Sequence, residues 1–369
     1  MSLDALIINP GDQVGIYQSL APDLTAKEPT IWGRLLGSYL QGRGFSVQLI
    51  DAAALNWGAE EIAEAAKSSD PKLVIVLAYG HQPSASTQQM PAVIATCAEL
   101  SKEECGEIPT FVIGGHPAAL PQQTLRETNA YFVSTGEGFI TADRLLTGLR
   151  DFGWPYHSSG TDSWIREVPG LCYWENLKPQ TTQPAPNLEN LAEAPGGLWH
   201  QLPMENYRAH NWHALTNGGE TKPYASIYTS IGCSFGCSFC NIQSPFREGD
   251  NLKFKGRANS YRTWPVEVVM AEIEMLVGKY GIINLKIADE MFSLRPSHVL
   301  PLCRAIAERG YGSHLNTWAY CRVDTARPEF LEAMRNAGVR WLCLGIEAAS
   351  GDVRDGVDKN DYGELEIIE

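Results

Sequence analysis

Short apolar runs alternate with longer amphipathic stretches along the first 150 residues. The run at 72–78 is apolar almost throughout, which is typical of a strand buried on both faces of a sheet. At 31–41 and 59–67, apolar residues recur at helical spacing. Further strands are predicted at 5–9, 45–51, 110–113 and 131–134. This alternation predicts an α/β fold with a doubly wound, parallel, Rossmann-like sheet, which binds ligands beyond the carboxyl ends of its strands.

A second series of the same kind begins near residue 225. Its predicted strands lie at 225–230, 283–288, 314–320 and 340–346. Its predicted helices lie at 265–280, 296–309 and 328–337. Successive βα units predict part of a (βα) barrel, with its chemistry at the carboxyl ends of the strands.

The two series divide the chain into a domain at 1–150 and a partial barrel at 223–369. The segment between them, 151–222, is rich in proline, aromatic residues, glutamine and threonine, and we interpret it as a connecting segment. Four barrel strands would leave an unpaired edge, and residues 363–369 resemble the start of a helix. We therefore expect the sequence to be truncated at its C-terminus.

The formal net charge is −14, which argues against binding to nucleic acid or to an anionic membrane surface. The N-terminus has neither the cationic start nor the long apolar stretch of a signal peptide. The apolar run at 73–79 is too short to span a bilayer. The nine cysteines are odd in number and mostly scattered. Reduced thiols and a cytoplasmic location are therefore expected.

Glycine and polar residues collect where strands of the first series end. The segments are Pro10-Gly11, Tyr79-Gly80-His81-Gln82, Gly114-Gly115-His116-Pro117 and Gly136-Glu137-Gly138. Each by itself could simply be a turn. Four of them at one edge favour a ligand face, and no G-x-G-x-x-G motif follows the first strand to indicate a dinucleotide.

Three cysteines directly after the first barrel strand form the pattern C-x3-C-x2-C: Cys233, Cys237 and Cys240. Three thiolates can hold an iron–sulfur cube at three corners and leave one iron open to a cofactor. A structural zinc site is the alternative, but zinc prefers four ligands, and His210, His213 and Cys321 lack the usual spacing. A redox dithiol at Cys237 and Cys240 would leave Cys233 without a role.

The cysteine pattern resembles that of radical SAM enzymes, and the glycine loops of the first domain resemble the cobalamin-binding domain of their cobalamin-dependent branch. The resemblance covers essentially the whole chain. It implies three cofactors: a 4Fe-4S cluster on Cys233, Cys237 and Cys240, S-adenosylmethionine, and cobalamin. The cluster would donate one electron to S-adenosylmethionine, received from a flavodoxin- or ferredoxin-type protein, and so produce a 5′-deoxyadenosyl radical.

The resemblance also implies cofactor contacts at other strand ends. Phe239 would lie beside the adenine, and Asp289 or Glu290 would hold the amino group of S-adenosylmethionine, although the Gly-Gly-Glu common in the family is missing here. Arg322 would either bind the carboxylate of S-adenosylmethionine or form a salt bridge with Asp324. Glu347 would bind the ribose or the amine, unless it is merely a solvated carboxylate.

In the first domain, the resemblance implies that two loops contact cobalamin. Their residues are Gly114, Gly115, His116, Gly136, Glu137 and Gly138. The D-x-H-x-x-G motif that supplies a histidine ligand to cobalt is absent. We hypothesise that the lower face of cobalt has no histidine ligand. His81 and His116 lie in candidate loops but not in such a motif.

The expected activity is methylation of an unactivated carbon of a small molecule, such as a natural-product, lipid or sugar precursor. Methylcobalamin would deliver the methyl group to a substrate radical, and a second S-adenosylmethionine would then remethylate the cobalamin. A cyclase or rearrangement enzyme and a non-catalytic cobalamin-binding protein are the alternatives. A methylthiotransferase is less favoured, because Cys97 and Cys105 do not lie in strand-end loops. The sequence does not identify the substrate or the oligomeric state.

Overall fold

The structure is a computed structural model that describes residues 3–11, 15–16, 24–80, 83–102, 108–154, 163–246, 260–359 and 361–368. Contacts divide the chain into two units. The first comprises Met1–Ala21, Thr30–Pro203 and Asn241–Leu252, and the second comprises Pro22–Pro29, Met204–Cys240 and Lys253–Glu369. Among the described residues, no helix has an apolar stretch of the length that a bilayer crossing requires.

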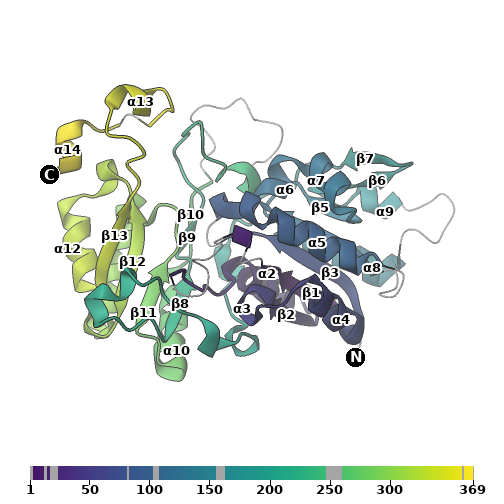
Figure 1. The fold of residues 1–369 in the computed structure, drawn as a ribbon, viewed down its shortest axis with the longest axis horizontal. Helices are drawn as coiled ribbons and strands as arrows, with labels where there is room; N and C mark the ends of the chain where they lie inside the picture. Colours follow the sequence, from purple (N-terminus) through teal and green to yellow (C-terminus); the bar gives the residue numbers. More distant parts are fainter. Residues whose placement is uncertain are drawn as a thin grey trace. The chain divides into compact units, whose positions relative to one another are not determined.

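The first unit contains a seven-stranded sheet in the order β2-β1-β3-β4-β5-β6-β7 (Figure 1). Its strands are β1 (Leu3–Asn9), β2 (Val47–Asp51), β3 (Pro71–Ala78), β4 (Thr110–Gly114), β5 (Phe132–Ser134), β6 (Leu171–Glu175) and β7 (Lys178–Thr181). The first five run parallel, and the last two are antiparallel. The strand order reverses between β1 and β3, and a doubly wound sheet binds its ligand at such a point.

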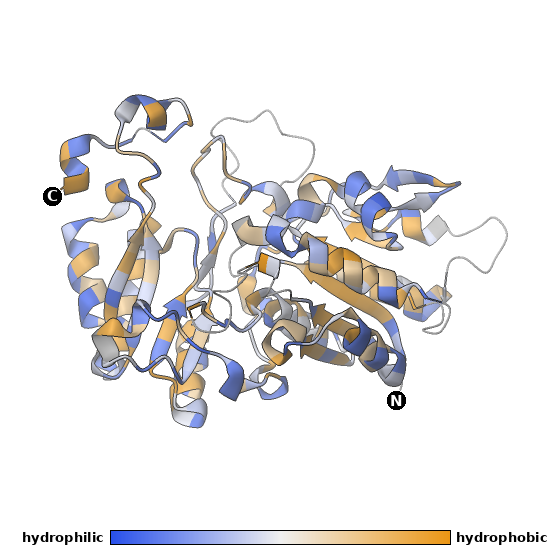
Figure 2. Cartoon of the chain, in the orientation of Figure 1, coloured by the Kyte–Doolittle hydropathy of each residue, from blue (hydrophilic) through white to orange (hydrophobic). Residues whose placement is uncertain are grey.

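Helices cover both faces of this sheet. They are α2 (Ile31–Gly42), α3 (Ala52–Leu55), α4 (Ala59–Ser69), α5 (Met90–Leu100), α6 (Gly115–Ala119), α7 (Pro121–Thr128), α8 (Phe139–Phe152) and α9 (Ser163–Arg166). Leu6 and Val74 pack in one buried cluster with Ile62 of α4 and Val93 of α5. Because side chains alternate along a strand, Ile7 points to the opposite face, where α2 lies. Figure 2 shows the central strands as the hydrophobic part of the unit.

The hairpin β6–β7 extends the sheet from within the segment interpreted as a connection. Its strands join at Asn176 and Leu177, which both have positive φ, as the favoured two-residue hairpin turns require. The turn lacks the glycine that usually marks such a hairpin, and β7 is hydrophilic (Figure 2). Because of these two features, the hairpin could not be recognised in the sequence.

The second unit contains a parallel sheet in the order β13-β12-β11-β8. Its strands are β8 (Tyr224–Ile227), β11 (Asn284–Ile287), β12 (Asn316–Cys321) and β13 (Val339–Leu344). The helices are α10 (Val266–Tyr280), α11 (Pro296–Glu308), α12 (Pro328–Asn336), α13 (Gly351–Asp355) and α14 (Glu364–Ile368). A short ribbon pairs β9 (Ser230–Ile231) with β10 (Arg262–Thr263). The predicted fold class, a doubly wound sheet followed by a βα series of the barrel type, is confirmed.

The face of this sheet that carries Lys286 also carries Trp318, whose ring centroid lies 4.8 Å from the Lys286 Nζ atom. Lys286 is buried and forms a two-pronged ion pair with Glu28, at 2.9 Å to each carboxylate oxygen. Trp212 and His213 pack against Trp318. This face is therefore lined by aromatic rings around one buried ion pair.

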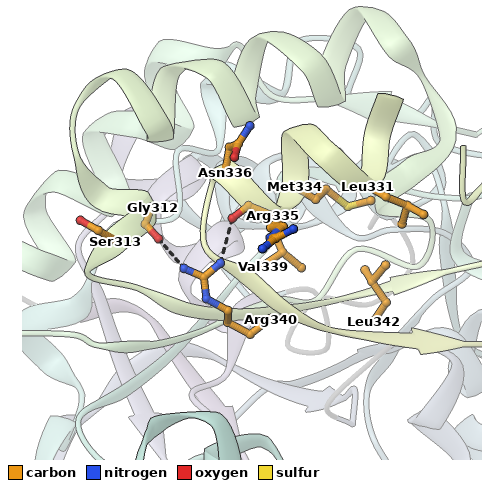
Figure 3. Close-up of a pocket in the computed structure, with 9 residues that line it drawn as sticks. All are labelled: Gly312, Ser313, Leu331, Met334, Arg335, Asn336, Val339, Arg340 and Leu342. Atoms are coloured by element: carbon orange, nitrogen blue, oxygen red, sulfur yellow. Dashed lines mark hydrogen bonds between the residues drawn. The ribbon is translucent and has the colours of Figure 1, made fainter. Parts of the chain in front are cut away.

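A cavity of about 780 Å³ lies between α12 and the beginning of β13 (Figure 3). Arg340 reaches across it and donates to the carbonyl oxygens of Arg335 and Gly312, at 2.8 and 2.9 Å. The contact with Arg335 caps a carbonyl in the last turn of α12. The cavity lies at the amino ends of the strands, opposite the edge where barrel chemistry takes place, so we assign it a structural role.

Candidate functional site

The cysteine loop leaves the carboxyl end of β8 and is held by the ribbon β9–β10. Gly232 has a φ of +81°, and a Cβ atom there would lie 2.4 Å from the carbonyl oxygen of Ser260. Only glycine fits this position without strain. The Cys233 backbone N–H then donates to the Ser260 hydroxyl at 3.3 Å. The start of the loop is therefore set by its backbone before any cofactor binds.

Polar groups lie beside two of the three cysteine sulfurs. The pKa of the Cys233 thiol is raised to about 12, mainly by burial and to a smaller extent by Cys240, Glu290 and Cys237, while the Phe235 backbone N–H acts to lower it. That N–H donates to the Cys233 sulfur at 3.4 Å, and the Arg322 guanidinium lies 3.7 Å from the Cys237 sulfur. At Cys233 the N–H donor offsets only part of the effect of burial, so this thiol keeps its proton at neutral pH and would release it on binding a metal.

The described residues contain no group of three histidine, cysteine or acidic side chains close enough to hold a metal ion. Cys233 is buried, whereas Cys237 and Cys240 are partly exposed. The assignment of these cysteines to a cluster therefore stays a prediction, with a donor set that fits it.

Asp289 follows β11 and is fully buried. Its carboxylate accepts the Thr229 N–H at 2.6 Å and the Thr229 and Ser230 hydroxyls at 2.5 and 2.7 Å. Burial raises its pKa to about 6, against the lowering effect of these bonds. The side chain predicted to contact S-adenosylmethionine is thus engaged with the stem of the cysteine loop.

Glu290, the next residue, differs from Asp289. Its Oε1 atom is buried and has no hydrogen-bond partner among the described residues. Burial raises the pKa of this carboxyl to about 8, while Lys286 lowers it and Asp289 raises it. A buried acceptor without a partner is costly unless a ligand satisfies it.

Arg322 follows β12 and is only 4% exposed. The salt bridge to Asp324 that the sequence left open is present, at 2.8 Å, and Asp361 forms a second one at 2.6 Å. The guanidinium also stacks over Phe235, 3.7 Å from the ring centroid. Arg322 thus joins the cysteine loop to Asp361, and its fork is filled by two carboxylates in this structure.

Glu347 follows β13 and has a φ of +65°, which is rare for a residue with a side chain. It pairs with Lys359 at 2.6 Å, and the Lys359 ammonium lies 5.9 Å from the Phe239 ring centroid. The Phe239 ring is 54% exposed. In addition, the Ser238 N–H donates to the carbonyl oxygen of Val357 at 3.1 Å. The predicted positions Phe239 and Glu347 therefore meet through one lysine.

The second predicted site lies at the carboxyl edge of the first sheet. The His116 N–H donates to the Ser86 hydroxyl at 2.9 Å, and its Nδ1 atom lies 3.2 Å from the Thr87 hydroxyl. Three buried polar atoms at this edge have no hydrogen-bond partner in the described part of the chain: His116 Nε2, the Tyr79 hydroxyl and Trp32 Nε1. His81, which belongs to a neighbouring loop, lies outside the described residues.

The loop glycines have structural reasons of their own. A Cβ at Gly114 would lie 2.2 Å from the carbonyl oxygen of Ala78 on the adjacent strand. Gly138 has a φ of +92°, and a Cβ there would approach Ile113 within 2.7 Å. Gly115 is buried, and the Gly136 N–H donates to the Ser134 hydroxyl at 3.2 Å.

Glu137 is nearly fully buried and accepts the backbone N–H of Leu188. It therefore attaches this edge of the sheet to the segment that follows the β6–β7 hairpin. Its carboxylate also raises the pKa of Tyr79, after the larger effect of burial.

Two cavities of the first unit adjoin these loops. One of about 710 Å³ is lined by Ala118, Arg126, Thr135 and Ser244 among others, directly beside the two glycine loops. A smaller one, of about 230 Å³, lies at Pro10-Gly11 between α4 and α5. Cobalamin carries many amide groups, which can bond to the unpartnered polar atoms at this edge, so the residues present fit such a ligand.

Two family descriptions match the chain. The B12 binding domain matches residues 21–146, and the Radical SAM superfamily matches residues 227–368. The fold and the cysteine loop thus define a radical SAM protein with a preceding cobalamin domain. The chain combines a B12-binding domain with a radical SAM domain, the two domains that its resemblance to cobalamin-dependent radical SAM enzymes implied. The predicted cofactors, cobalamin, S-adenosylmethionine and a 4Fe-4S cluster, are those of the two matched domains.

Individual proteins support this assignment. The chain is 27% identical over 314 residues to the uncharacterized methyltransferase PH0819 of Pyrococcus horikoshii, covering 85% of this chain and 60% of that protein. The radical S-adenosylmethionine methyltransferase TsrM from Kitasatospora setae, with tryptophan substrate and a SAM analog bound, superposes with a TM-score of 0.70 at 19% identity. That match covers 99% of this chain and 64% of TsrM.

The cobalamin-dependent S-adenosylmethionine radical enzyme OxsB, with aqua-cobalamin and S-adenosylmethionine bound, superposes with a TM-score of 0.66 at 15% identity. The match covers 99% of this chain and 47% of OxsB. At such identities the similarity to both solved structures shows the fold. The chain spans less than two thirds of the length of each of these three proteins.

Sequence reasoning missed several residues that shape the site: Thr229, Ser230, Ser260, His298, Lys359 and Asp361. The Thr-Ser pair before the cysteine loop was a visible signal, because two hydroxyls beside a buried strand end need acceptors. Asp361 gave no signal, since it lies 39 positions after Arg322 and meets it only in the folded chain.

Proposed function

We propose that this chain is the cofactor-binding part of a methyltransferase that acts on an unactivated carbon of a small molecule. One observation carries the proposal: the C-x3-C-x2-C loop follows the first barrel strand of a chain whose other matched domain binds B12. The name of the Pyrococcus horikoshii relative supports methyl transfer. TsrM, with its tryptophan substrate, supports a small molecule as the acceptor.

In the barrel unit, Cys233, Cys237 and Cys240 would hold the cluster. Glu290 would accept hydrogen bonds from the amino group of S-adenosylmethionine, because its buried Oε1 atom has no partner among the described residues. Arg322 would bind the carboxylate of S-adenosylmethionine if Asp361, its partly exposed partner, gave way. Phe239 and Glu347 would contact the adenine and the ribose.

In the first unit, the loops at Gly114–His116 and Gly136–Gly138 would hold cobalamin at the carboxyl edge of the sheet. When bound, the cluster and S-adenosylmethionine supply radical chemistry, and cobalamin supplies the methyl group. The chain's own residues bind and orient these groups and keep buried polar atoms paired. The electron donor would be a flavodoxin- or ferredoxin-type protein, and the partners would not include nucleic acid.

A cytoplasmic location would suit this chemistry, because oxygen-sensitive clusters require reducing conditions. The eight cysteines in the described part of the chain are all free of disulfides. This agrees with a compartment that keeps thiols reduced.

The test is anaerobic reconstitution of the full-length protein with iron, sulfide and cobalamin. Incubation with S-adenosylmethionine labelled in its methyl group, and with a chemical reductant, should yield labelled methylcobalamin, S-adenosylhomocysteine and 5′-deoxyadenosine. A protein with all three loop cysteines changed to alanine should bind no cluster and yield no 5′-deoxyadenosine.

The products also separate the alternatives. Formation of 5′-deoxyadenosine without methyl transfer to cobalamin would refute the methyltransferase and favour a cyclase or rearrangement enzyme. Bound cobalamin without any iron would identify a non-catalytic cobalamin-binding protein.

A further inference from the structure

We infer that Asp289 is a positioning residue that sets the direction in which the cysteine loop leaves the barrel. This inference rests on the proposed cluster site. It assigns Asp289 a task other than contact with S-adenosylmethionine.

Among the described residues, the side-chain and backbone donors bonded to the Asp289 carboxylate belong to the stem of the loop. Oδ1 accepts the Thr229 backbone N–H at 2.6 Å, and Oδ2 accepts the Thr229 and Ser230 hydroxyls at 2.5 and 2.7 Å. Thr229 and Ser230 directly precede the loop, and Cys233 follows three positions later. All three residues are buried, so water does not compete for these bonds.

A fourth residue completes the network and fixes its proton positions. Thr229 donates its single hydroxyl proton to Asp289. The Thr229 hydroxyl oxygen must therefore accept a hydrogen bond from His298 Nε2, which lies 2.9 Å away. His298 lies on α11, whereas Asp289 lies after β11. The Asp289 network (Asp289, Thr229, Ser230 and His298) therefore ties the loop to two successive elements of the barrel.

Nearby backbone hydrogen bonds also help to fix the position of Thr229. The Ala288 N–H donates to the carbonyl oxygen of Ile227 at 2.8 Å, which continues the β8–β11 pairing up to the network. The Trp264 N–H donates to the carbonyl oxygen of Thr229 at 3.0 Å. Thr229 is thus held on its N–H, its hydroxyl and its carbonyl, and the chain beyond it can leave in one direction.

Glu290 provides the contrast that separates the two acids. Its buried Oε1 atom has no partner among the described residues, whereas both Asp289 oxygens have close donors. The Asp289 carboxylate accepts three hydrogen bonds out of about four that a carboxylate can accept, so little of it is left for a ligand's ammonium group. A closer contact with the ammonium group would require breaking charge-assisted bonds to the loop stem, so the exchange would be unfavourable.

The experiment uses the full-length protein, reconstituted anaerobically with cluster, and compares Asp289→Asn with the wild type. Asparagine keeps the volume but replaces one acceptor by a donor that faces a hydroxyl. We expect the cluster to lose iron to excess chelator about ten-fold faster or more, as for other residues that orient metal ligands. In the molecules that keep their cluster, the change that S-adenosylmethionine produces in the electron paramagnetic resonance spectrum of the reduced cluster should be weakened.

Two further variants show whether the effect passes through the loop stem. Thr229→Val removes the hydroxyl and should reproduce the Asp289→Asn result, while Thr229→Ser keeps it and should behave like the wild type. If Asp289→Asn does not fold, this pair carries the test. Asp51→Asn is the matched control, because Asp51 is also buried and accepts three hydrogen bonds, but in the first unit. It should lower stability without changing the cluster spectrum.

The outcomes distinguish this inference from the proposed function. A wild-type protein that binds no cluster refutes the proposed function itself. A wild-type cluster with unchanged iron loss in both Asp289→Asn and Thr229→Val overturns the positioning role. Loss of S-adenosylmethionine binding in Asp289→Asn alone, with a normal cluster in Thr229→Val, would make Asp289 a cofactor ligand and would also overturn the inference.

Discussion

The buried ion pair between Lys286 and Glu28 offers a sharp test of what holds the barrel unit together. The two side chains are 1% and 6% exposed, and the ammonium lies 2.9 Å from both carboxylate oxygens. Changing Glu28 to glutamine removes the negative charge and leaves a buried ammonium without its counter-ion. Breaking one partner of a buried pair costs about 3–5 kcal/mol.

The surroundings of Lys286 indicate a loss of unfolding free energy in the upper part of this range. Lys286 lies 4.8 Å from the Trp318 ring centroid and 5.5 Å from that of Tyr320, so the rings replace water around the charge. The rings attract the ammonium but cannot accept a hydrogen bond as a carboxylate does. A double variant, Glu28→Gln with Lys286→Met, removes both charges and should recover most of the loss.

The assay is urea unfolding followed by tryptophan fluorescence, to which Trp318 beside the pair contributes as one of ten tryptophans. Glu267→Gln is the matched control, because Glu267 forms an ion pair of the same 2.9 Å length with Arg309 in the same unit but is 80% exposed. That exposed pair should contribute less than about 1 kcal/mol. If Glu28→Gln costs no more than Glu267→Gln, burial does not govern the strength of this pair and the reasoning fails.

Three further predictions concern the cofactors and pH. Glu290→Gln should weaken binding of S-adenosylmethionine about ten-fold or more while the cluster absorption stays unchanged, since one charge-assisted hydrogen bond is worth about 1.5–3 kcal/mol; an unchanged dissociation constant would exclude Glu290 from the cofactor site. Burial lowers the pKa of His213 to about 3. As pH falls below about 6.5, this histidine therefore binds a proton in the unfolded chain but not in the folded protein. From pH 7.5 to 5.0 this should cost about 2 kcal/mol in unfolding free energy, measured by urea titration, and His213→Phe should remove that share; an equal pH dependence in the variant would contradict the prediction. The cob(II)alamin form should show no nitrogen superhyperfine coupling in its electron paramagnetic resonance spectrum, and a coupling that disappears in His116→Ala would reveal a histidine ligand instead.

Much of the barrel unit could be predicted because its strands carry local signals. Strands were expected at 225–230, 283–288, 314–320 and 340–346, and the structure has β8 and β9, β11, β12 and β13 there. Pattern and period operate over a few neighbouring residues, so they survive without knowledge of the fold. The β6–β7 hairpin escaped notice because its turn uses Asn176 and Leu177 instead of glycine.

The candidate site was predicted by position more than by role. Strand ends located Asp289, Glu290 and Arg322 at one edge, because parallel strands bring their carboxyl ends together. Which of two adjacent acids is already occupied depends on where each side chain points and on the donors around it. Thr229 and Asp361 supply those donors and acceptors from 60 and 39 positions away.

The sequence alone determined most of the strands and helices, the succession of a doubly wound series and a barrel-type series, and the cysteine spacing on which the predicted chemistry rests. These properties are written in neighbouring residues and therefore need no folding to be read. Only the tertiary structure decided that Asp289 is engaged with the loop stem, that a buried Glu290 oxygen has no hydrogen-bond partner in the described part of the chain, and that Glu28 neutralises Lys286. Burial and partnership arise when distant segments meet, since the cost of removing a charge from water depends on every group that surrounds it.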